Sequence, residues 1–310
     1  MEARQADLLP IPYFHVVFTL PHALNALAQG NPRVLYTLLF RAAAETLLAF
    51  GRDPRGFGGT IGVTAILHTW SQTLTQHLHV HCLVTGGAVS RDRTRWIRGR
   101  VSFLFPVAAL SVVFRATYLA GLQRAFTEGD LTFAAGTAPL ADARHFHALV
   151  APLRATPWVV YAKRPFGGPT QVLQYLGRYT HRIAISNARL ISLTDGVVRF
   201  RWKDYADRGR TKIMALAAEE FLRRFLLHVL PRGFVRIRHF GLLANAQRRA
   251  TLAHARSLLN APTPTTSSAD RRVADGDRSR CPVCHHGRWQ VVEILRPLRP
   301  PFGTLTPDTS

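Results

Sequence analysis

The sequence predicts an α+β fold whose central sheet is mostly antiparallel and is flanked by helices. Short runs rich in aromatic and β-branched residues alternate with stretches of helical periodicity, without the steady strand–helix–strand rhythm of a parallel sheet. Two of these runs are separated by only a few polar residues, as in a hairpin. With 310 residues, 47% of them hydrophobic, the chain can bury a sizeable core.

Proline and glycine residues bound the predicted elements in the first half of the chain. Pro21 stops an apolar run of strand-like composition, and Gly51 ends a stretch in which leucine and alanine recur at helical spacing. The polar residues 71–76 separate two strand-like runs and therefore predict a hairpin. The expected elements are a strand over 13–20, a helix over 32–50, and strands over 61–70 and 77–85.

The second half of the chain continues the mixed pattern. Pro169 stands where a helix prefers its first residue, so a helix is expected from Thr170 to about His181. The other expected elements are helices over 106–126, 141–153 and 217–230, strands over 158–163, 182–187, 190–193 and 197–202, and a basic segment over 232–249. Composition divides the chain into a main folded region over 1–258, a flexible linker over 259–280 and a short tail over 281–310.

The charge of the chain points to a polyanionic partner. Lys and Arg number 40 against 18 Asp and Glu, a net charge of +22, so a nucleic acid is the expected partner. Two windows contain no acidic residue, one between Asp53 and Asp92 and the other between Asp142 and Asp195. These windows disfavour a catalytic site built from three carboxylates, and they hold every residue of the candidate catalytic site.

Cysteine content and hydropathy bear on the cellular location. Three cysteines exclude a disulfide scaffold and fit a reducing cytoplasm. No run approaches the ~18 uninterrupted apolar residues of a membrane span, and the N-terminal residues lack the basic-then-apolar layout of a signal peptide. We therefore expect a cytoplasmic protein without a membrane partner.

The first acid-free window holds four closely spaced histidines, three of which form a candidate metal site. Side chains alternate along a strand, so His77, His79 and His81 share one face, and the apolar residues between them share the other. His68 precedes His79 by 11 residues, and pairing across the hairpin would place the two side by side. Three imidazoles would then converge from two strands. The alternative is a solvated face that is rich in histidine.

The donor set of this site would consist of imidazoles. No carboxylate lies in the window, and Gln72 and Gln76 are the candidate oxygen donors. A divalent ion without negatively charged ligands stays strongly electrophilic, which suits the polarisation of a phosphate oxygen. The pattern therefore favours chemistry on phosphodiesters.

Two tyrosines in the second acid-free window are candidate nucleophiles. Tyr175 and Tyr179 are four residues apart on a predicted helix, which places them on one face roughly 6 Å apart. Between Arg144 and Thr194 there are seven cations and no acid. A phenol becomes a better nucleophile where cations favour the phenolate. Packing of both rings in the core is the alternative.

Three motifs in order carry a resemblance to a known family. They are Leu67-His68-Thr69-Trp70 with His77-Leu78-His79-Val80-His81-Cys82, then Tyr175-Leu176-Gly177-Arg178-Tyr179-Thr180-His181-Arg182, then the run 220–241. Together they resemble the two-tyrosine rolling-circle transposases (insertion-sequence ninety-one type) of the His-hydrophobic-His (HUH) endonuclease superfamily. The resemblance runs from about Tyr13 to Arg249, most of the chain.

The resemblance implies a fold, an activity and a set of site residues. It implies an HUH-type catalytic region over 1–258, with an antiparallel sheet flanked by helices. His79 and His81 would bind Mg²⁺ or Mn²⁺ and orient the scissile phosphate of single-stranded DNA, at the element ends and at the target. Tyr175 and Tyr179 would be the nucleophiles, which leave a 5′-phosphotyrosine and a free 3′-hydroxyl. We add His68 as the third metal ligand.

Basic residues near the tyrosines are expected to bind the DNA. They are Lys163, Arg164, Arg178 and Arg182. In the tail, Cys281 and Cys284 supply only half of a tetrahedral zinc site, so bound zinc is the less favoured interpretation. Family members usually carry a cysteine-rich zinc-binding segment before the catalytic region. Met1 falls where that segment would be ending, so we expect this chain to lack it.

Two alternatives to an active transposase stay open. A truncated, catalytically inactive remnant that acts only as a basic DNA-binding protein would fit the net charge of +22 equally well. A replication initiator or conjugative relaxase would use the same chemistry and differ mainly in its DNA substrate.

Overall fold

The computed structural model describes residues 8–100, 104–166 and 184–261. The chain groups into two compact units, Met1–Thr263 and Pro264–Ser310, and every described residue belongs to the first. The predicted helix from Thr170 to His181, and almost all of the predicted linker and tail, lie outside the described residues.

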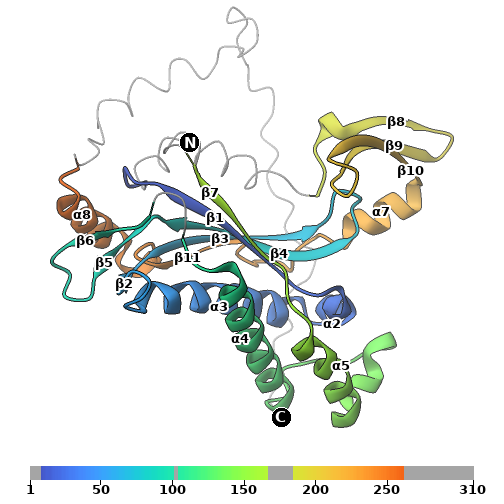
Figure 1. The fold of residues 1–310 in the computed structure, drawn as a ribbon. Helices are drawn as coiled ribbons and strands as arrows, with labels where there is room; N and C mark the ends of the chain where they lie inside the picture. The colour runs from blue at the N-terminus through green and yellow to red at the C-terminus, as the bar shows by residue number, and fades with distance from the viewer. Residues whose placement is uncertain (1–7, 101–103, 167–183, 262–310) are drawn as a thin grey trace, which may run out of the picture. The chain divides into compact units, whose positions relative to one another are not determined.

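The main sheet has five strands, and all of its pairings are antiparallel (Figure 1). Its order is β11 (Ile237–Gly241), β3 (Gly62–Trp70), β4 (Gln76–Thr85), β1 (Tyr13–Thr19) and β7 (Val160–Phe166). The predicted α+β class with an antiparallel sheet is confirmed. The predicted hairpin consists of β3 and β4, which pair antiparallel and are joined by the short segment between them.

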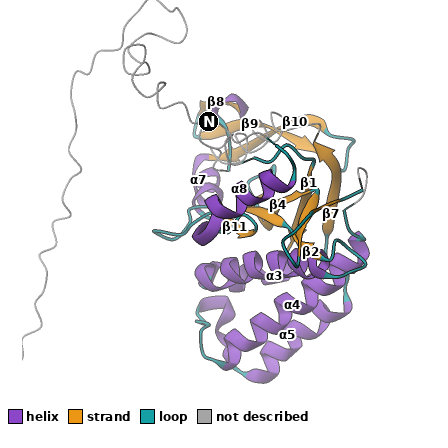
Figure 2. Cartoon of the chain, turned by 90° about the vertical axis from the view of Figure 1, so that its left-hand side faces the viewer, coloured by secondary structure: helices purple, strands orange, loops and turns teal. Residues whose placement is uncertain are grey.

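Helices cover one face of the main sheet, and α3, α4 and α5 lie beneath the strands in Figure 2. The helices are α2 (Asn25–Gly30), α3 (Pro32–Arg52), α4 (Val107–Thr127) and α5 (Ala143–Ala155). Every second residue of β1 and β4, such as Phe18 and Val80, joins the core cluster formed with Leu39 and Phe114 of the helices. Each large side chain buried in this way stabilises the fold by about 1.5–3 kcal/mol.

Helix α3 bears on the expectation that the chain has no membrane span. Among the described residues it is the one helix long and apolar enough to cross a membrane by length and composition. Arg41 and Glu45 interrupt its apolar sequence and form an ion pair on its surface. Its buried residues, including Leu35 and Leu47, belong to the main core. Such burial is the usual position of a core helix.

The other face of the main sheet is divided into two parts. Tyr13, Ile66 and Leu83 form a second apolar cluster with Leu252 of α8 (Arg248–Leu258). Farther along the same strands, residues of the same parity are histidines. Because successive side chains alternate between faces, these histidines lie on the side away from α3 and α4.

Two smaller sheets complete the described part of the chain. One has the order β10 (Arg210–Ala217), β9 (Val197–Asp204) and β8 (Leu190–Thr194), and α7 (Ala218–Leu226) packs on it. Phe221 of α7 contacts Phe200 of β9 at a ring distance of 5.8 Å. The other has the order β2 (Gly59–Thr60), β5 (Gly87–Ser90) and β6 (Trp96–Arg98).

Several predictions for the second half of the chain are wrong. In the predicted strand over 182–187, residues 184–186 are not in a strand, and a 3₁₀ turn, Asn187–Arg189, follows. The helix predicted over 217–230 ends at Leu226, and the side chain of His228 bonds instead to the β3–β4 hairpin. The predicted basic segment over 232–249 contains β11 and the first two residues of α8, and no element was predicted at β10. The other predicted elements that fall on described residues are confirmed to within a few residues.

Candidate metal centre

The β3–β4 hairpin brings three histidines together. Its register pairs His68 directly with His79, as the spacing predicts, and His81 follows on the same face of β4. One ring nitrogen from each of the three lies within 4.8 Å of the other two. His68 is 4% exposed and His81 9%. The apolar residues that alternate with them on β4 belong to the main core, so the predicted division of the two faces is confirmed.

Hydrogen bonds fix the orientation of two of these rings. Nδ1 of His79 lies 2.8 Å from the carbonyl oxygen of His77. A carbonyl only accepts, so Nδ1 carries the proton and Nε2 is left as a lone-pair donor for a metal. His81 Nδ1 lies 2.8 Å from Nε2 of His15, a buried histidine on β1. If His81 Nδ1 donates this bond, its Nε2 is likewise left for a metal.

Burial keeps these imidazoles neutral. Desolvation lowers the pKa of His79 to about 3 and that of His15 to about 4, and it holds the pKa of His81 well below its ordinary value. The positive charge of Lys163 lowers the pKa of His15 and His81 further. Metal ligands must be deprotonated, so the cluster is ready to bind a cation at neutral pH.

The donor set fits a divalent transition-metal ion. Three imidazole nitrogens suit such ions, whereas Mg²⁺ prefers oxygen ligands, so Mn²⁺ fits this cluster better than Mg²⁺. The candidate oxygen donor Gln76 is engaged elsewhere, because its Oε1 accepts from Gln29 at 2.7 Å. Gln72 lies nearer to β9, where its Oε1 accepts a long bond of 3.5 Å from the backbone N–H of Lys203.

A second pair of histidines adjoins the cluster. His77 shares the face of His79 and His81, as predicted, but its Nδ1 contacts Nε2 of His22 at 3.1 Å. Burial lowers the pKa of His77. Neither His22 nor His15 was a sequence candidate, because each meets the cluster only through the folding of a distant segment onto β4. His15 could have been predicted as a neighbour of the cluster only from the register of β1 with β4, which places it on the histidine face of the sheet.

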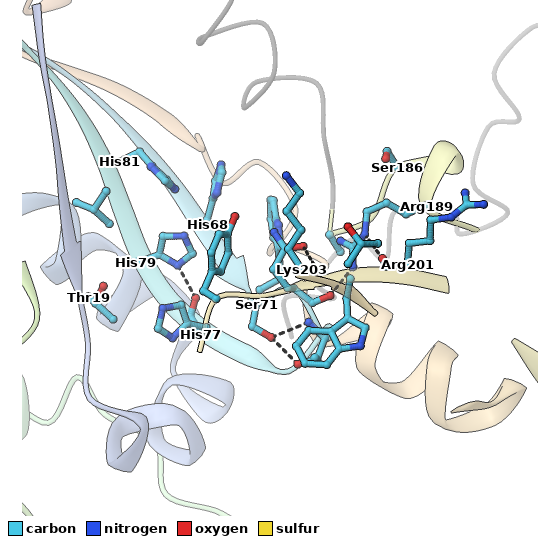
Figure 3. Close-up of a pocket in the computed structure, with 18 residues that line it drawn as sticks. Thr19, His68, Ser71, His77, His79, His81, Ser186, Arg189, Arg201 and Lys203 are labelled. Atoms are coloured by element: carbon cyan, nitrogen blue, oxygen red, sulfur yellow. Dashed lines mark hydrogen bonds between the residues drawn. The ribbon is translucent and has the colours of Figure 1, made fainter. Parts of the chain in front are cut away.

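The histidines open onto a groove of 980 Å³ (Figure 3). Histidines lie at one end, and Arg189 and Arg201 lie toward the other, beside β8 and β9. The lining comprises Val17, Thr19, His68, Trp70, Ser71, Gln72, Thr73, His77, His79, His81, Ala184, Ser186, Arg189, Arg201, Trp202, Lys203, Tyr205 and Thr211. None of these described lining residues is acidic, so the groove is suited to an anionic ligand.

The sheet of β8, β9 and β10, called the small sheet below, and α7 contact the tip of the β3–β4 hairpin. Leu74, at the tip, is fully buried in the core of the small sheet with a positive φ of 62°. Arg189 donates to the carbonyl oxygen of Gln72, Arg224 donates to that of Thr73 at 3.2 Å, and His228 Nε2 lies 3.0 Å from that of Leu74. Three side chains from distant segments thus fix the loop that joins β3 to β4.

Only part of the predicted DNA and catalytic set falls on described residues. Lys163 is exposed on β7 and pairs with His15 of β1, so it lies on the histidine face of the sheet. Arg164 lies on the same strand, and its side chain is outside the described part. The remaining candidates, Tyr175, Tyr179, Arg178, Arg182, Cys281 and Cys284, lie outside the described residues.

A protein-family model described as "Putative transposase" matches residues 62–250, more than half of the chain. The chain therefore belongs to this transposase family. The match begins at β3 and includes the histidine cluster, the small sheet and most of the groove.

Two named relatives agree with this membership. "Putative transposase y4qJ" of Sinorhizobium fredii is 49% identical over 304 residues, which cover 95% of this chain and 76% of that protein. "Transposase for insertion sequence element IS801" of Pseudomonas savastanoi pv. phaseolicola is 30% identical over 246 residues, which cover 78% of this chain and 57% of that protein. This chain thus spans little more than half the length of the second relative.

Among solved structures, the conjugative relaxase TrwC in complex with mutant oriT DNA is similar at 15% identity. The match covers 78% of this chain and 72% of that chain, with a TM-score of 0.29. This level of similarity is too low to show a shared fold.

Proposed function

We propose that this chain is a metal-dependent single-stranded DNA endonuclease and strand transferase, which moves a transposable element by rolling-circle-type cleavage. The observation that carries the proposal is the cluster of His68, His79 and His81 in a chain of a transposase family. The cluster is held on paired strands, burial keeps His79 and His81 neutral, and none of the described residues that line the groove is acidic.

The three histidines would hold Mn²⁺ or Mg²⁺ through their ring nitrogens. A divalent ion bound there supplies a Lewis acid for a phosphate oxygen. The protein contributes rigidity, because the ligands stand on two hydrogen-bonded strands rather than on loops. Lys163, on the same face of the sheet, would attract the DNA backbone toward the cluster.

The proposed nucleophiles are Tyr175 and Tyr179, a role that rests on the resemblance of the motif around them. A tyrosine phenolate attacks phosphorus, a bond from phosphorus to the tyrosine oxygen forms, and the bond to the 3′-oxygen breaks. The 3′-oxygen takes up a proton and leaves as a free hydroxyl. The phosphotyrosine conserves the bond energy that rejoining needs, whereas hydrolysis would lose it.

The metal step is tested by single-turnover nicking of a long circular single-stranded DNA, which offers many sequences at once. We expect nicking with Mn²⁺ and none with EDTA. The double variant His79→Ala, His81→Ala should lose cleavage and bind DNA within a few-fold of wild type, because contacts to phosphates dominate affinity. His22→Ala, which removes a histidine outside the cluster, is the matched control. Wild-type-like nicking by the double variant would refute the metal site, and DNA binding without nicking by wild type would favour the inactive remnant.

The covalent step is tested with tyrosine-to-phenylalanine variants, which remove only the phenolic oxygen. The double variant Tyr175→Phe, Tyr179→Phe should fold and bind DNA but form no covalent adduct. Each single variant should fail complete strand transfer. Tyr161→Phe is the matched control, since Tyr161 is an exposed tyrosine on β7. Mass spectrometry should locate the adduct on Tyr175 or Tyr179. An adduct on Tyr161 or Tyr205, or robust nicking by the double variant, would overturn the assignment.

A further inference from the structure

We propose that the small sheet binds the segment of single-stranded DNA next to the scissile phosphate. Arg201 and Lys203 of β9 would contact phosphates, and Tyr205 would stack on a base. The identity of the strand rests on the proposed function, but the surface is defined by the structure of the groove itself.

The core of the small sheet decides which way these cations point. Val198 and Phe200 of β9 are buried against α7, in the cluster that also contains Leu74. Since side chains alternate along a strand, Arg201 and Lys203 project from the opposite face. Both are exposed, and both line the groove that contains the histidines.

Neither of these two cations has an acidic partner among the described residues, whereas several cations around them do. Lys212, on the adjacent strand, is paired with Asp204 at 2.8 Å and with Asp207 at 3.0 Å. The arginines of α7 are paired in the same way with Glu220. Asp204, Asp207 and Glu220 are therefore committed to other cations, which leaves Arg201 and Lys203 available to an anionic ligand.

Tyr205 supplies the aromatic component of a single-strand site. It follows β9 directly, lines the groove and is 71% exposed. Such exposure gives a large ring little stability from core packing. Sites for single-stranded nucleic acid combine cations along the backbone with exposed aromatic rings on which bases stack. Trp202 also borders the groove, but it packs against the core of the small sheet on the side of Phe200.

Arg189 has a different role, although it also lines the groove. Its Nε donates to the carbonyl oxygen of Arg201 at 2.7 Å, and its Nη2 donates to that of Gln72 at the hairpin tip. The guanidinium also lies over the ring of Phe200, 5.6 Å from its centre. Arg189 therefore connects the β3–β4 hairpin to β9 and fixes the two ends of the groove with respect to each other.

The test measures equilibrium binding of a fluorescent single-stranded oligonucleotide in EDTA, so that no cleavage takes place. The double variant Arg201→Ala, Lys203→Ala should make the log–log salt slope shallower by about 1.4, because each phosphate that a cation neutralises adds about 0.7 to the slope. Tyr205→Leu should weaken binding about 5- to 150-fold without changing that slope, because stacking is worth about 1–3 kcal/mol per base. The control, Arg144→Ala with Arg154→Ala, removes the same charge from the exposed side of α5.

The comparison with duplex DNA and with metal-dependent nicking separates the outcomes. If the groove variants bind the single strand like the α5 control, the proposed surface is wrong, even if wild type nicks DNA. If Tyr205→Leu weakens duplex and single-strand binding equally, the surface is a general polyanion site and the assignment is overturned. Selective loss of single-strand binding supports the inference, and it does so even if wild type fails to nick, in which case only the proposed function is refuted.

Discussion

Replacing His15 with leucine should weaken metal binding without removing any ligand. His15 is 4% exposed on β1, and its Nε2 lies 2.8 Å from Nδ1 of His81. Leucine keeps much of the buried volume but cannot accept a hydrogen bond. The His81 ring would then lose the hydrogen bond that fixes its tautomer and its orientation toward the cluster.

The size of the effect follows from this single hydrogen bond. Loss of a partner that orients a metal ligand typically lowers metal affinity 10- to 100-fold, which is about 1.4–2.7 kcal/mol. His15→Gln should recover most of the affinity, because its amide oxygen can accept the hydrogen bond that His81 Nδ1 donates when its Nε2 binds the metal. His22→Leu is the matched control. It removes a similar histidine–histidine contact of 3.1 Å, but from His77, which is outside the three-histidine cluster.

Titration calorimetry with Mn²⁺ at neutral pH measures these affinities directly, and circular dichroism checks that each variant is folded. We expect the order wild type, His15→Gln, His15→Leu from tight to weak, with His22→Leu close to wild type. A folded His15→Leu variant that binds Mn²⁺ within two-fold of wild type would refute the reasoning. Equal losses for the His15 and His22 variants would show that the effect is not specific to the ligand.

Three further predictions concern stability and reactivity. Unfolded histidine takes up a proton near pH 6.5, whereas burial lowers the pKa of His15 to about 4 and of His79 to about 3, so the free energy of unfolding should fall as the pH drops below 6.5. At pH 5, protonation of unfolded His15 alone should lower the free energy of unfolding by about 2 kcal/mol relative to neutral pH. Urea denaturation of His15→Leu should therefore show a decrease between neutral pH and pH 5 that is smaller than in wild type by about 2 kcal/mol. Leu74→Ala should lower the free energy of unfolding by about 2–5 kcal/mol in the same assay, because it empties a fully buried site at the hairpin tip; a loss below 1 kcal/mol would mean that the tip is not anchored. Burial raises the pKa of Cys82, so this thiol should react with alkylating reagents only after unfolding, and peptide mapping that finds it modified in the native protein would contradict its placement.

The sequence predicts the β3–β4 hairpin and its histidine face well because their determinants are local. The alternation along β4 and the short polar segment before it specify both the face and the register of the histidines. That register places His68 opposite His79. Leu74 was not predicted to be special, since positive φ is usually a property of glycine or asparagine. Its conformation depends on the core of the small sheet, which is contributed by residues more than 100 positions away.

The parts of the site that the sequence did not predict depend on contacts between distant segments. His15 reaches His81 only because β1 pairs with β4, and nothing in the local pattern of β1 distinguishes this histidine from its neighbours. β11 lies in the segment 232–249, which the sequence marks only as basic. Arg238 of this strand packs between Phe40 and Phe234, at 4.7 and 5.0 Å from their ring centres. Composition alone does not separate such a packed arginine from one that binds phosphate.

The arrangement of the main sheet explains how a site without carboxylates can be both rigid and neutral. His79 and His81 of β4 are each flanked in sequence by residues that pack into the main core, such as Val80 and Cys82. A slip of one residue would turn the histidines into that core and the apolar residues into the groove, so burial of one face fixes the position of the other. The same strand pairing packs the histidines against one another on the other face, where burial keeps His79 and His81 unprotonated. The main sheet therefore fixes the positions of the three histidines. The contacts of the small sheet and α7 with the hairpin tip fix the position of the groove beside them.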